Sequence, residues 1–236
     1  MIDLFSVSDQ CEVFGREVVL FDRLDFRLPP GRYALLSHSP EYRPLVMDII
    51  GGLRPPRQGW VEITGSVSWP IGRAAMLRSK ATGIEFVYLV ADLYGIDRAY
   101  AGEFVSSLIS RPEYLDVSLY VWPPWVRQEF NFALGLVPEF DIYLVDSQIP
   151  SDDSRFARLW QALFEQRLVG KTLILSAARP KQMLDYCAKA LVFDDGQLEI
   201  ETDLEQCLER FPIRSAREAV GDITNAGVES GADFLF

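Results

Sequence analysis

The sequence predicts an α/β protein, because its 236 residues pass through three successive patterns. In the first third, polar and apolar residues alternate as they do in antiparallel strands. From Gly83 to about Leu136, apolar residues recur with the period of a helix. The last third alternates short apolar runs with helical segments, which is typical of parallel strands joined by right-handed crossovers.

Four strands are expected in the first third, at residues 2–7, 17–21, 24–28 and 32–37. Residues 29–31, Pro-Pro-Gly, provide the turn before the last of them, since proline and glycine favour turn conformations. Residues 59–69, "GWVEITGSVSW", predict a further hairpin that turns at Thr64 and Gly65. The first third is therefore expected to form a mainly antiparallel sheet.

The rest of the chain predicts helices and then an α/β alternation. In residues 83–95, the residues that recur at the i, i+3, i+4 and i+7 spacing of a helix are Ile84, Val87, Tyr88 and Ala91. The nearly all-apolar run "FDIYLVD" at residues 140–146 is typical of a strand buried on both faces. Strands at 171–176 and 189–193, helices at about 153–167 and 180–187, and a hairpin turn at Asp195–Gly196 are expected after it.

Composition and charge narrow the function classes. A net charge of -11 repels a phosphate backbone, so nucleic-acid binding is not expected. A single histidine, His38, argues against a multi-histidine metal site or histidine-based catalysis. No apolar run is long enough to span a bilayer and no basic leader begins the chain, so a cytoplasmic location is expected. The three scattered cysteines are expected to be reduced.

The stretch from Tyr33 to Gly59 places an apolar strand, a short polar loop, a helix and a double glycine in the order found around a phosphate-binding loop. Two further strand ends follow along the chain, Asp146 after "FDIYLV" and Ser176 after "TLIL". Together with "SVSWPIG", "TGIEFVYLVADLYG" and "DDSRF", this layout resembles the nucleotide-binding subunit of an ABC transporter. The closer resemblance is to the ATPase subunit of capsular and lipopolysaccharide exporters, and it covers residues 1–193.

The resemblance implies an ABC-type ATPase fold: a RecA-like P-loop NTPase core with an N-terminal antiparallel β subdomain and a helical subdomain. We expect this domain at residues 1–212, with the helical subdomain at roughly 83–137. Residues 213–236, which are rich in small and acidic residues, are expected to form a C-terminal tail.

The loop that matches the family's phosphate-binding motif has lost the residues that grip phosphate. That motif, G-x-x-x-x-G-K-[ST], uses glycines so that backbone N–H groups can close on the phosphates, a lysine for the β/γ-phosphates and a hydroxyl for Mg²⁺. The matching loop begins at Ser37, reads "SHSPEYRP" and contains no glycine. Arg43 stands near the lysine position and Pro44 near the hydroxyl position, while Pro40 has no N–H to donate. Arg43 is interpreted instead as a surface arginine or an ion-pair partner of Glu41 or Asp48.

The two later strand ends have changed as well. The resemblance puts Asp146 at the Walker B position, which makes it a weak candidate for a Mg²⁺ ligand; the alternative is a strand-end aspartate that satisfies nearby groups. The next residue in the family is the glutamate that polarises water, and here it is Ser147, which is no general base at neutral pH. Ala177 stands where the family has a histidine that senses the γ-phosphate.

The remaining motifs are also altered. The family's signature turn should let small residues approach a partner's nucleotide, but the matching stretch places Pro124 and Trp125 there. Trp122 and Trp125 are interpreted either as a rigid exposed patch or as part of the helical core. The linking glutamine falls near Arg78, and the stacking aromatic falls near Cys11.

The segments that build the fold match the family, whereas the residues that bind and hydrolyse ATP are replaced. This combination predicts a pseudo-ATPase related to the ATP-binding subunit of polysaccharide exporters, with no catalytic residue and no ATP or Mg²⁺ as cofactor. The expected partner is a protein, either an active ATPase subunit, the permease or a second copy, which would hold the chain peripherally at the inner membrane. One alternative is a divergent subunit that uses ATP and Mg²⁺ weakly or in a composite site. Another is a scaffold for polysaccharide synthesis that works without a permease.

Overall fold

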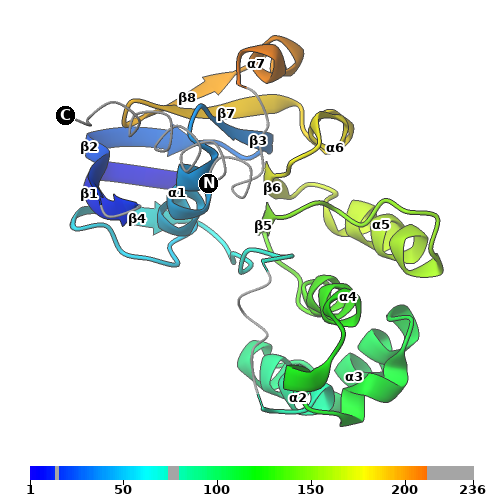
Figure 1. The fold of residues 1–236 in the computed structure, drawn as a ribbon. Helices are drawn as coiled ribbons and strands as arrows, with labels where there is room; N and C mark the ends of the chain where they lie inside the picture. Colours follow the sequence, from blue (N-terminus) through cyan, green and yellow to red (C-terminus); the bar gives the residue numbers. More distant parts are fainter. Residues whose placement is uncertain (14–15, 74–79, 212–236) are drawn as a thin grey trace, which may run out of the picture. The chain divides into compact units, whose positions relative to one another are not determined.

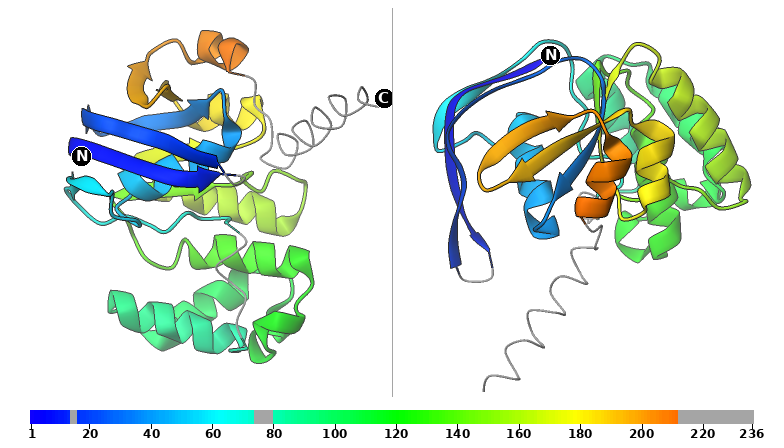
Figure 2. Two further views of the ribbon diagram at one scale, coloured as in Figure 1. Left: turned by 60° about the vertical axis from the view of Figure 1, so that its left-hand side comes forward. Right: turned by 90° about the horizontal axis from the view of Figure 1, so that it is seen from above.

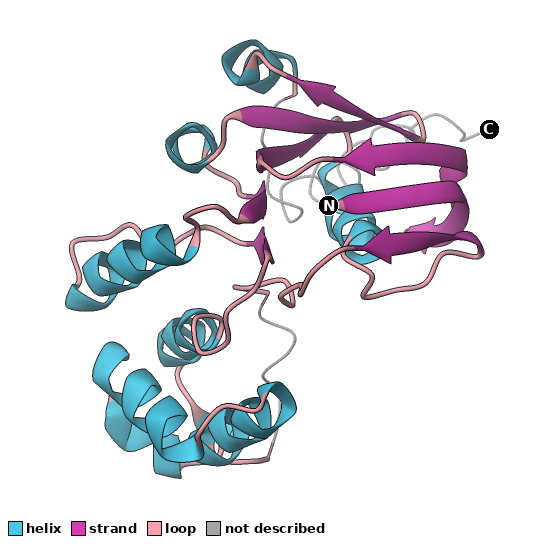
Figure 3. Ribbon diagram, turned by 180° about the vertical axis from the view of Figure 1, so that it is seen from behind, coloured by secondary structure: helices cyan, strands magenta, loops and turns pink. Residues whose placement is uncertain are grey.

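The computed structural model describes residues 1–13, 16–73 and 80–211, and the chain divides into two compact units. The first unit is made of Met1–Thr64 together with the chain from Ile174 onward, and the second is Gly65–Leu173. Each unit is described by itself. Figure 1 labels their helices and strands, and Figure 3 shows helices in cyan and strands in magenta.

The first unit contains an antiparallel sheet of three strands in the order β2-β1-β4. The strands are β1 (Ile2–Val13), β2 (Arg16–Leu28) and β4 (Gln58–Ile63). Ile2 of β1 pairs with Leu28 of β2 on one side and with Ile63 of β4 on the other. The long β1 and β2 strands run side by side in both views of Figure 2.

The prediction of separate strands at 17–21 and 24–28 is wrong, because β2 runs through both without a break. Val7 of β1 pairs with Leu24 of β2, and Asp9 pairs with Phe21. A step of two residues along β1 therefore matches a step of three along β2, so β2 carries one extra residue there. Arg23 adopts a φ of 50°, and its N–H donates a hydrogen bond of 2.8 Å to the Ser8 hydroxyl. This β-bulge absorbs the polar interruption that resembles a turn in the sequence.

The first unit also contributes β3 (Arg32–Ser37), β7 (Lys189–Asp194) and β8 (Gln197–Glu201) to a mixed sheet in which β6 (Thr172–Ser176) is the neighbour of β3. β3 pairs in parallel with β7, from Tyr33 opposite Lys189 to Ser37 opposite Phe193. β7 and β8 form the predicted hairpin, and its turn residues Asp195 and Gly196 have φ values of 43° and 76°. The expectation that residues 32–37 join an antiparallel sheet is therefore wrong, because β3 pairs in parallel with β7, whereas the predicted hairpin is confirmed.

The first unit also has short helices. They are η1 (Pro40–Tyr42), α1 (Arg43–Ile50), α6 (Pro180–Tyr186) and α7 (Leu204–Arg210). α7 lies against β3 and β7, and α1 lies against β3. The rings of Phe21 in β2 and Phe193 in β7 meet edge to face with centroids 5.5 Å apart, so the antiparallel and mixed sheets share one core.

The second unit is mainly helical. Its elements are α2 (Gly83–Tyr94), α3 (Arg98–Leu108), η3 (Pro112–Asp116), η4 (Leu119–Val121), α4 (Pro124–Leu134), β5 (Ile142–Asp146) and α5 (Arg155–Arg167). α2 begins at a capping box between Thr82 and Glu85 and ends at Gly95, whose φ is 66°. Val87 and Ala91 are buried as its helical spacing predicts. The predicted helical middle section is confirmed.

The predicted hairpin at residues 59–69 is wrong. β4 ends at Ile63, and the chain then runs parallel to β5 with bridges from Val67 to Ile142 and from Ile71 to Val145. Gly65 has a φ of 102°, and a Cβ there would lie 2.8 Å from the side chain of Asp141. The glycine that suggests a turn in the sequence instead permits this close approach.

Within the ranges that the structure describes, no helix has the length and apolarity that crossing a membrane requires. The bounds 1–212 and 83–137 stay predictions. The predicted tail at 213–236 lies outside the described residues.

Candidate functional site

The loop from Ser37 to Pro44, which connects β3 to α1, uses its own backbone donors. The Ser39 N–H donates to the Ser37 hydroxyl at 3.2 Å, and the Tyr42 N–H donates to the Ser39 carbonyl at 3.0 Å. The Arg43 N–H donates to the carbonyl of Pro40. Pro40 and Pro44 have no N–H. These bonds form because the prolines favour a tight 3₁₀ turn at residues 40–42, where a glycine loop would stay open.

Arg43 is buried, with 6% of its surface exposed, so the interpretation as a surface arginine is wrong. Its Nε donates to the Pro40 carbonyl at 3.4 Å, which holds the guanidinium back against the loop that precedes it. The start of α1 therefore carries its positive charge inside the fold. The alternative of an ion pair with Glu41 or Asp48 stays a prediction.

A pocket of about 270 Å³ lies beside the loop. It is lined by Val18, Val19, Ser37, His38, Ser39, Tyr42, Phe193, Asp194, Asp195 and Gly196. Burial raises the pKa of Tyr42, and the charge of Glu41 raises it further. Since Asp194 and Asp195 add exposed carboxylates, the acidic groups around this pocket disfavour an anion.

His38 is exposed, and its ring centroid lies 4.3 Å from that of Phe211. Tyr42 is half-buried and meets Phe193 edge to face at 6.3 Å. Tyr42 thus borders the space beside the loop from the side of β7.

Asp146 ends β5 in the second unit, and its carboxylate is engaged. Its Oδ2 accepts a hydrogen bond of 2.9 Å from Nε of Arg73, and only 13% of the aspartate side chain and 24% of the arginine side chain are exposed. The Asp146 N–H donates to the Ile71 carbonyl at 3.1 Å. This geometry agrees with the interpretation of Asp146 as a strand-end aspartate that satisfies nearby groups.

Arg73 is the residue that sequence reasoning missed. It directly follows the "SWPIG" stretch, and the Asn131 amide of α4 donates to its carbonyl at 3.1 Å. The only signal for it in the sequence is a basic residue just after a conspicuous motif. Nothing local connects it with an aspartate 73 positions away.

Ser147 is packed against the same segment. Gly72 has a φ of 87°, and a Cβ built on it would lie 2.5 Å from Cβ of Ser147 and 2.9 Å from Cζ of Phe132. The position that holds a water-polarising glutamate in the resembled family is therefore closed on one side by the backbone at Gly72. Ala177, which follows β6, is buried in the first unit and offers only a methyl group.

The stretch that matches the signature motif opens α4. Pro124 is in its first turn, and Pro123 at the N-cap gives no side-chain hydrogen bond. Trp125 is 47% exposed, whereas Trp122 is 2% exposed and donates from Nε1 to the Val117 carbonyl at 2.9 Å. Each of the two alternative interpretations therefore holds for one residue: Trp122 belongs to the core, and Trp125 belongs to the exposed surface.

The other predicted positions give little further geometry. Cys11 is half-exposed in β1, and burial raises its pKa. Arg78 lies outside the described residues. Across the described parts of the chain, no three histidine, cysteine or acidic side chains are grouped as a metal site requires.

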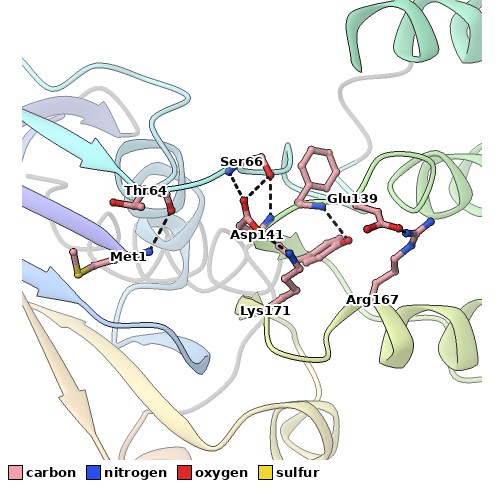
Figure 4. Close-up of polar contacts among 9 residues, drawn as sticks. Met1, Thr64, Ser66, Glu139, Asp141, Arg167 and Lys171 are labelled. Atoms are coloured by element: carbon pink, nitrogen blue, oxygen red, sulfur yellow. Dashed lines mark hydrogen bonds and ion pairs between the residues drawn. The ribbon is translucent and has the colours of Figure 1, made fainter. Parts of the chain in front are cut away.

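The charged cluster at the start of β5 also escaped sequence reasoning (Figure 4). The Asp141 carboxylate accepts from the Ser66 N–H at 3.0 Å and from the Lys171 ammonium at 2.7 Å. Lys171 above all, and then Ser66, lower the pKa of Asp141 to about 2. The Phe140 N–H donates to the Tyr143 hydroxyl close by at 3.2 Å. These contacts fix residues 66–71 along β5 and have no evident catalytic use.

Solved structures define the class of fold. The chain is similar to the ATP-binding cassette MJ0796, solved as a dimer in a post-hydrolysis state bound to ADP and Pi, with a TM-score of 0.67 and 17% identity over 86% of this chain and 98% of that one. A solved ATP-binding subunit of an ABC transporter gives a TM-score of 0.70 and 17% identity over 95% of this chain and 99% of that one. The chain therefore has the ABC-type ATPase fold, as predicted.

Sequence comparison gives the particular relatives. The chain is 27% identical to the ATP-binding protein BexA of Haemophilus influenzae over 88% of this chain and 98% of BexA. It is 28% identical to the capsule polysaccharide export ATP-binding protein CtrD of Neisseria meningitidis, over 84% and 91% of the two chains. It is 26% identical to the polysialic acid transport ATP-binding protein KpsT of Escherichia coli, over 78% and 83%. The predicted resemblance to this group is confirmed; no family model matches the chain.

Proposed function

We propose that this chain is a pseudo-ATPase, a non-hydrolysing structural or regulatory partner in capsular polysaccharide export. Its relatives are ATP-binding proteins of such export systems, and their similarity extends over most of the chain. The observation that carries the proposal is the loop between β3 and α1, whose N–H groups at Ser39, Tyr42 and Arg43 donate to acceptors within the loop itself.

The size of the effect supports loss of nucleotide binding. A hydrogen bond to a charged group contributes about 1.5 to 3 kcal/mol, so three lost phosphate contacts remove about 4.5 kcal/mol, or more than a thousandfold in affinity if they are additive. Pro40 and Pro44 cannot replace these donors because proline has no N–H. The carboxylates of Asp194 and Asp195 beside the loop would in addition repel a phosphate.

The residues at the end of β5 also do not fit Mg²⁺ and a reacting water. The Asp146 carboxylate accepts from Arg73, whose positive charge disfavours a second cation at the same oxygen atoms. A positioned general base contributes about 10² to 10⁴ in rate, and the Ser147 hydroxyl cannot accept a proton at neutral pH. These residues would therefore supply neither a free metal ligand nor a general base for hydrolysis.

We further propose that the chain works with a protein partner: an active ATPase subunit, an export permease or a second copy. One similar structure is a dimer of ATP-binding cassettes. Binding to a permease would place the chain peripherally at the cytoplasmic side of the inner membrane. The exposed Trp125 is in keeping with a contact surface at the start of α4, where the resembled family faces its partner subunit.

A turnover assay and a co-purification test these proposals. Pure protein should release no phosphate from Mg-ATP above the level of its Asp146→Asn variant, because Asp146 is the residue that keeps the type found at the metal-binding position of the resembled family. Turnover that disappears in Asp146→Asn, either alone or with an intact ATPase subunit, would instead establish the divergent or composite-site enzyme. Purification from cells should recover an export permease or ATPase; recovery of synthesis enzymes alone would favour the scaffold.

A further inference from the structure

The ion pair of Arg73 and Asp146 joins two segments of the second unit that are far apart in the sequence. Nε of Arg73 donates to Oδ2 of Asp146 at 2.9 Å, and both side chains are mostly buried. A charge-assisted hydrogen bond in a water-poor position is stronger and better defined than one at the surface. The pair therefore fixes the end of β5 to the residues that follow "SWPIG".

The backbone on both sides of the pair is fixed as well. The Ile71 N–H donates to the Leu144 carbonyl at 2.9 Å, and the Asp146 N–H donates to the Ile71 carbonyl at 3.1 Å. The Asn131 amide holds the carbonyl of Arg73 at 3.1 Å. Gly72, with its φ of 87°, lets the chain turn so that the arginine side chain reaches the carboxylate. Arg73 is thus positioned by its surroundings rather than by the ion pair alone.

We propose that the Arg73 guanidinium is a resident cation that takes the place of a divalent metal at the strand-end carboxylate of Asp146. The segment Ile71–Arg73 is then fastened to β5 permanently, without any nucleotide or metal. In the resembled ATPases this region follows "SWPIG" and leads to the residue that links the nucleotide site to the transporter. A fixed guanidinium would hold Ile71–Arg73 in one arrangement.

The consequence of this inference for transport rests on the proposed function, but the contact between the Arg73 guanidinium and the Asp146 carboxylate does not depend on that function. A guanidinium provides one positive charge and directional donors, which suit a single carboxylate. Mg²⁺ requires a near-octahedral set of oxygen atoms and gives up its water reluctantly, so it gains little from one carboxylate that is already paired. While Arg73 is in place, its guanidinium therefore satisfies Asp146, and a divalent cation gains little there.

The test compares thermal unfolding in EDTA and in millimolar Mn²⁺, with Mn²⁺ as a probe of a divalent site. Wild-type protein should unfold at the same Tm in both. Arg73→Met, which keeps the aliphatic stem, should lower the Tm by about 5 °C on the scaling for a chain of this length, and Mn²⁺ should recover part of that loss. The double variant Arg73→Met/Asp146→Asn should show no response to Mn²⁺.

Matched controls keep the result interpretable. Arg98 pairs with Asp92 at an exposed position of the same unit, so Arg98→Met should change the Tm little and give no response to Mn²⁺. Arg73→Lys keeps a positive charge and should stay insensitive to Mn²⁺, which preserves the test if Arg73→Met does not fold.

Two outcomes would overturn the inference. One is a rise in the wild-type Tm with Mn²⁺ that Asp146→Asn abolishes, since it would show the carboxylate open to a metal. The other is an Arg73→Met variant whose Tm does not fall, or whose Tm does not respond to Mn²⁺. If Arg73→Met does not fold, a rise in the Tm of Arg73→Lys with Mn²⁺ would overturn the inference instead. Tight Mg-ATP binding by wild-type protein with no Mn²⁺ effect on Tm would instead refute the pseudo-ATPase proposal and leave the resident cation in place.

Discussion

Replacing Gly72 with alanine should destabilise the second unit strongly, because the chain at this glycine presses against Ser147. A Cβ at Gly72 would lie 2.5 Å from Cβ of Ser147 and 2.9 Å from Cζ of Phe132, and the φ of 87° is itself strained for alanine. Positive φ costs about 1–2 kcal/mol for a residue with a Cβ, and overpacking costs about 1–3 kcal/mol. Together they predict a loss of about 2–5 kcal/mol, or a fall in Tm of roughly 5–15 °C.

The assay is thermal or urea unfolding followed by circular dichroism, with Gly95→Ala as the matched control. Gly95 has a φ of 66°, but a Cβ there would meet open space among the described residues. Gly95→Ala should therefore lose only about 1–2 kcal/mol. Removing the Ser147 side chain in the double variant Gly72→Ala/Ser147→Gly should recover part of the loss. Equal effects of Gly72→Ala and Gly95→Ala would refute the close approach at Ser147.

Three further changes have clear expected outcomes. The pKa of Asp141 in the folded protein is about 2, below its ordinary value of 3.8. The stabilising effect of its carboxylate is therefore present above about pH 4 and is lost as the pH falls towards 2. Asp141→Asn should flatten this part of the curve of unfolding free energy against pH, measured by urea unfolding. Trp122→Ala should cost about 3–5 kcal/mol in the same measurement, whereas the exposed Trp125→Ala should cost little. Burial raises the pKa of Cys187 to about 12, so its thiol should react with a maleimide at neutral pH only after unfolding. The half-exposed Cys11 can also react, so the label is located by mass spectrometry of peptides, and rapid labelling of Cys187 itself in the native protein would contradict this burial.

Elements with strong local signals could be predicted from the sequence. α2 has both an apolar repeat and a Thr82–Glu85 capping box, and the turn of the β7–β8 hairpin has an Asp-Gly pair whose positive φ values suit it. The errors came where tertiary contacts override local signals. A bulge at Arg23 continues β2 through an apparent break, and contact with Asp141 takes Gly65 out of the expected hairpin.

The same distinction applies to the candidate site. The absence of loop glycines, the two prolines and Ser147 are visible in the sequence, because each motif occupies a few consecutive residues. The burial of Arg43 and the pairing of Arg73 with Asp146 depend on the packing of segments that are distant in the chain. Sequence reasoning could therefore identify the missing donors, but it could not identify the groups that engage what remains.

Isothermal titration of the pure 236-residue chain with Mg-ATP tests the central claim most directly, since the claim concerns backbone donors that are no longer free to bind a triphosphate. We predict no saturable binding heat at micromolar or low millimolar nucleotide. A dissociation constant in the micromolar range, weakened by Asp146→Asn, would show that the loop and the strand end still form a nucleotide site.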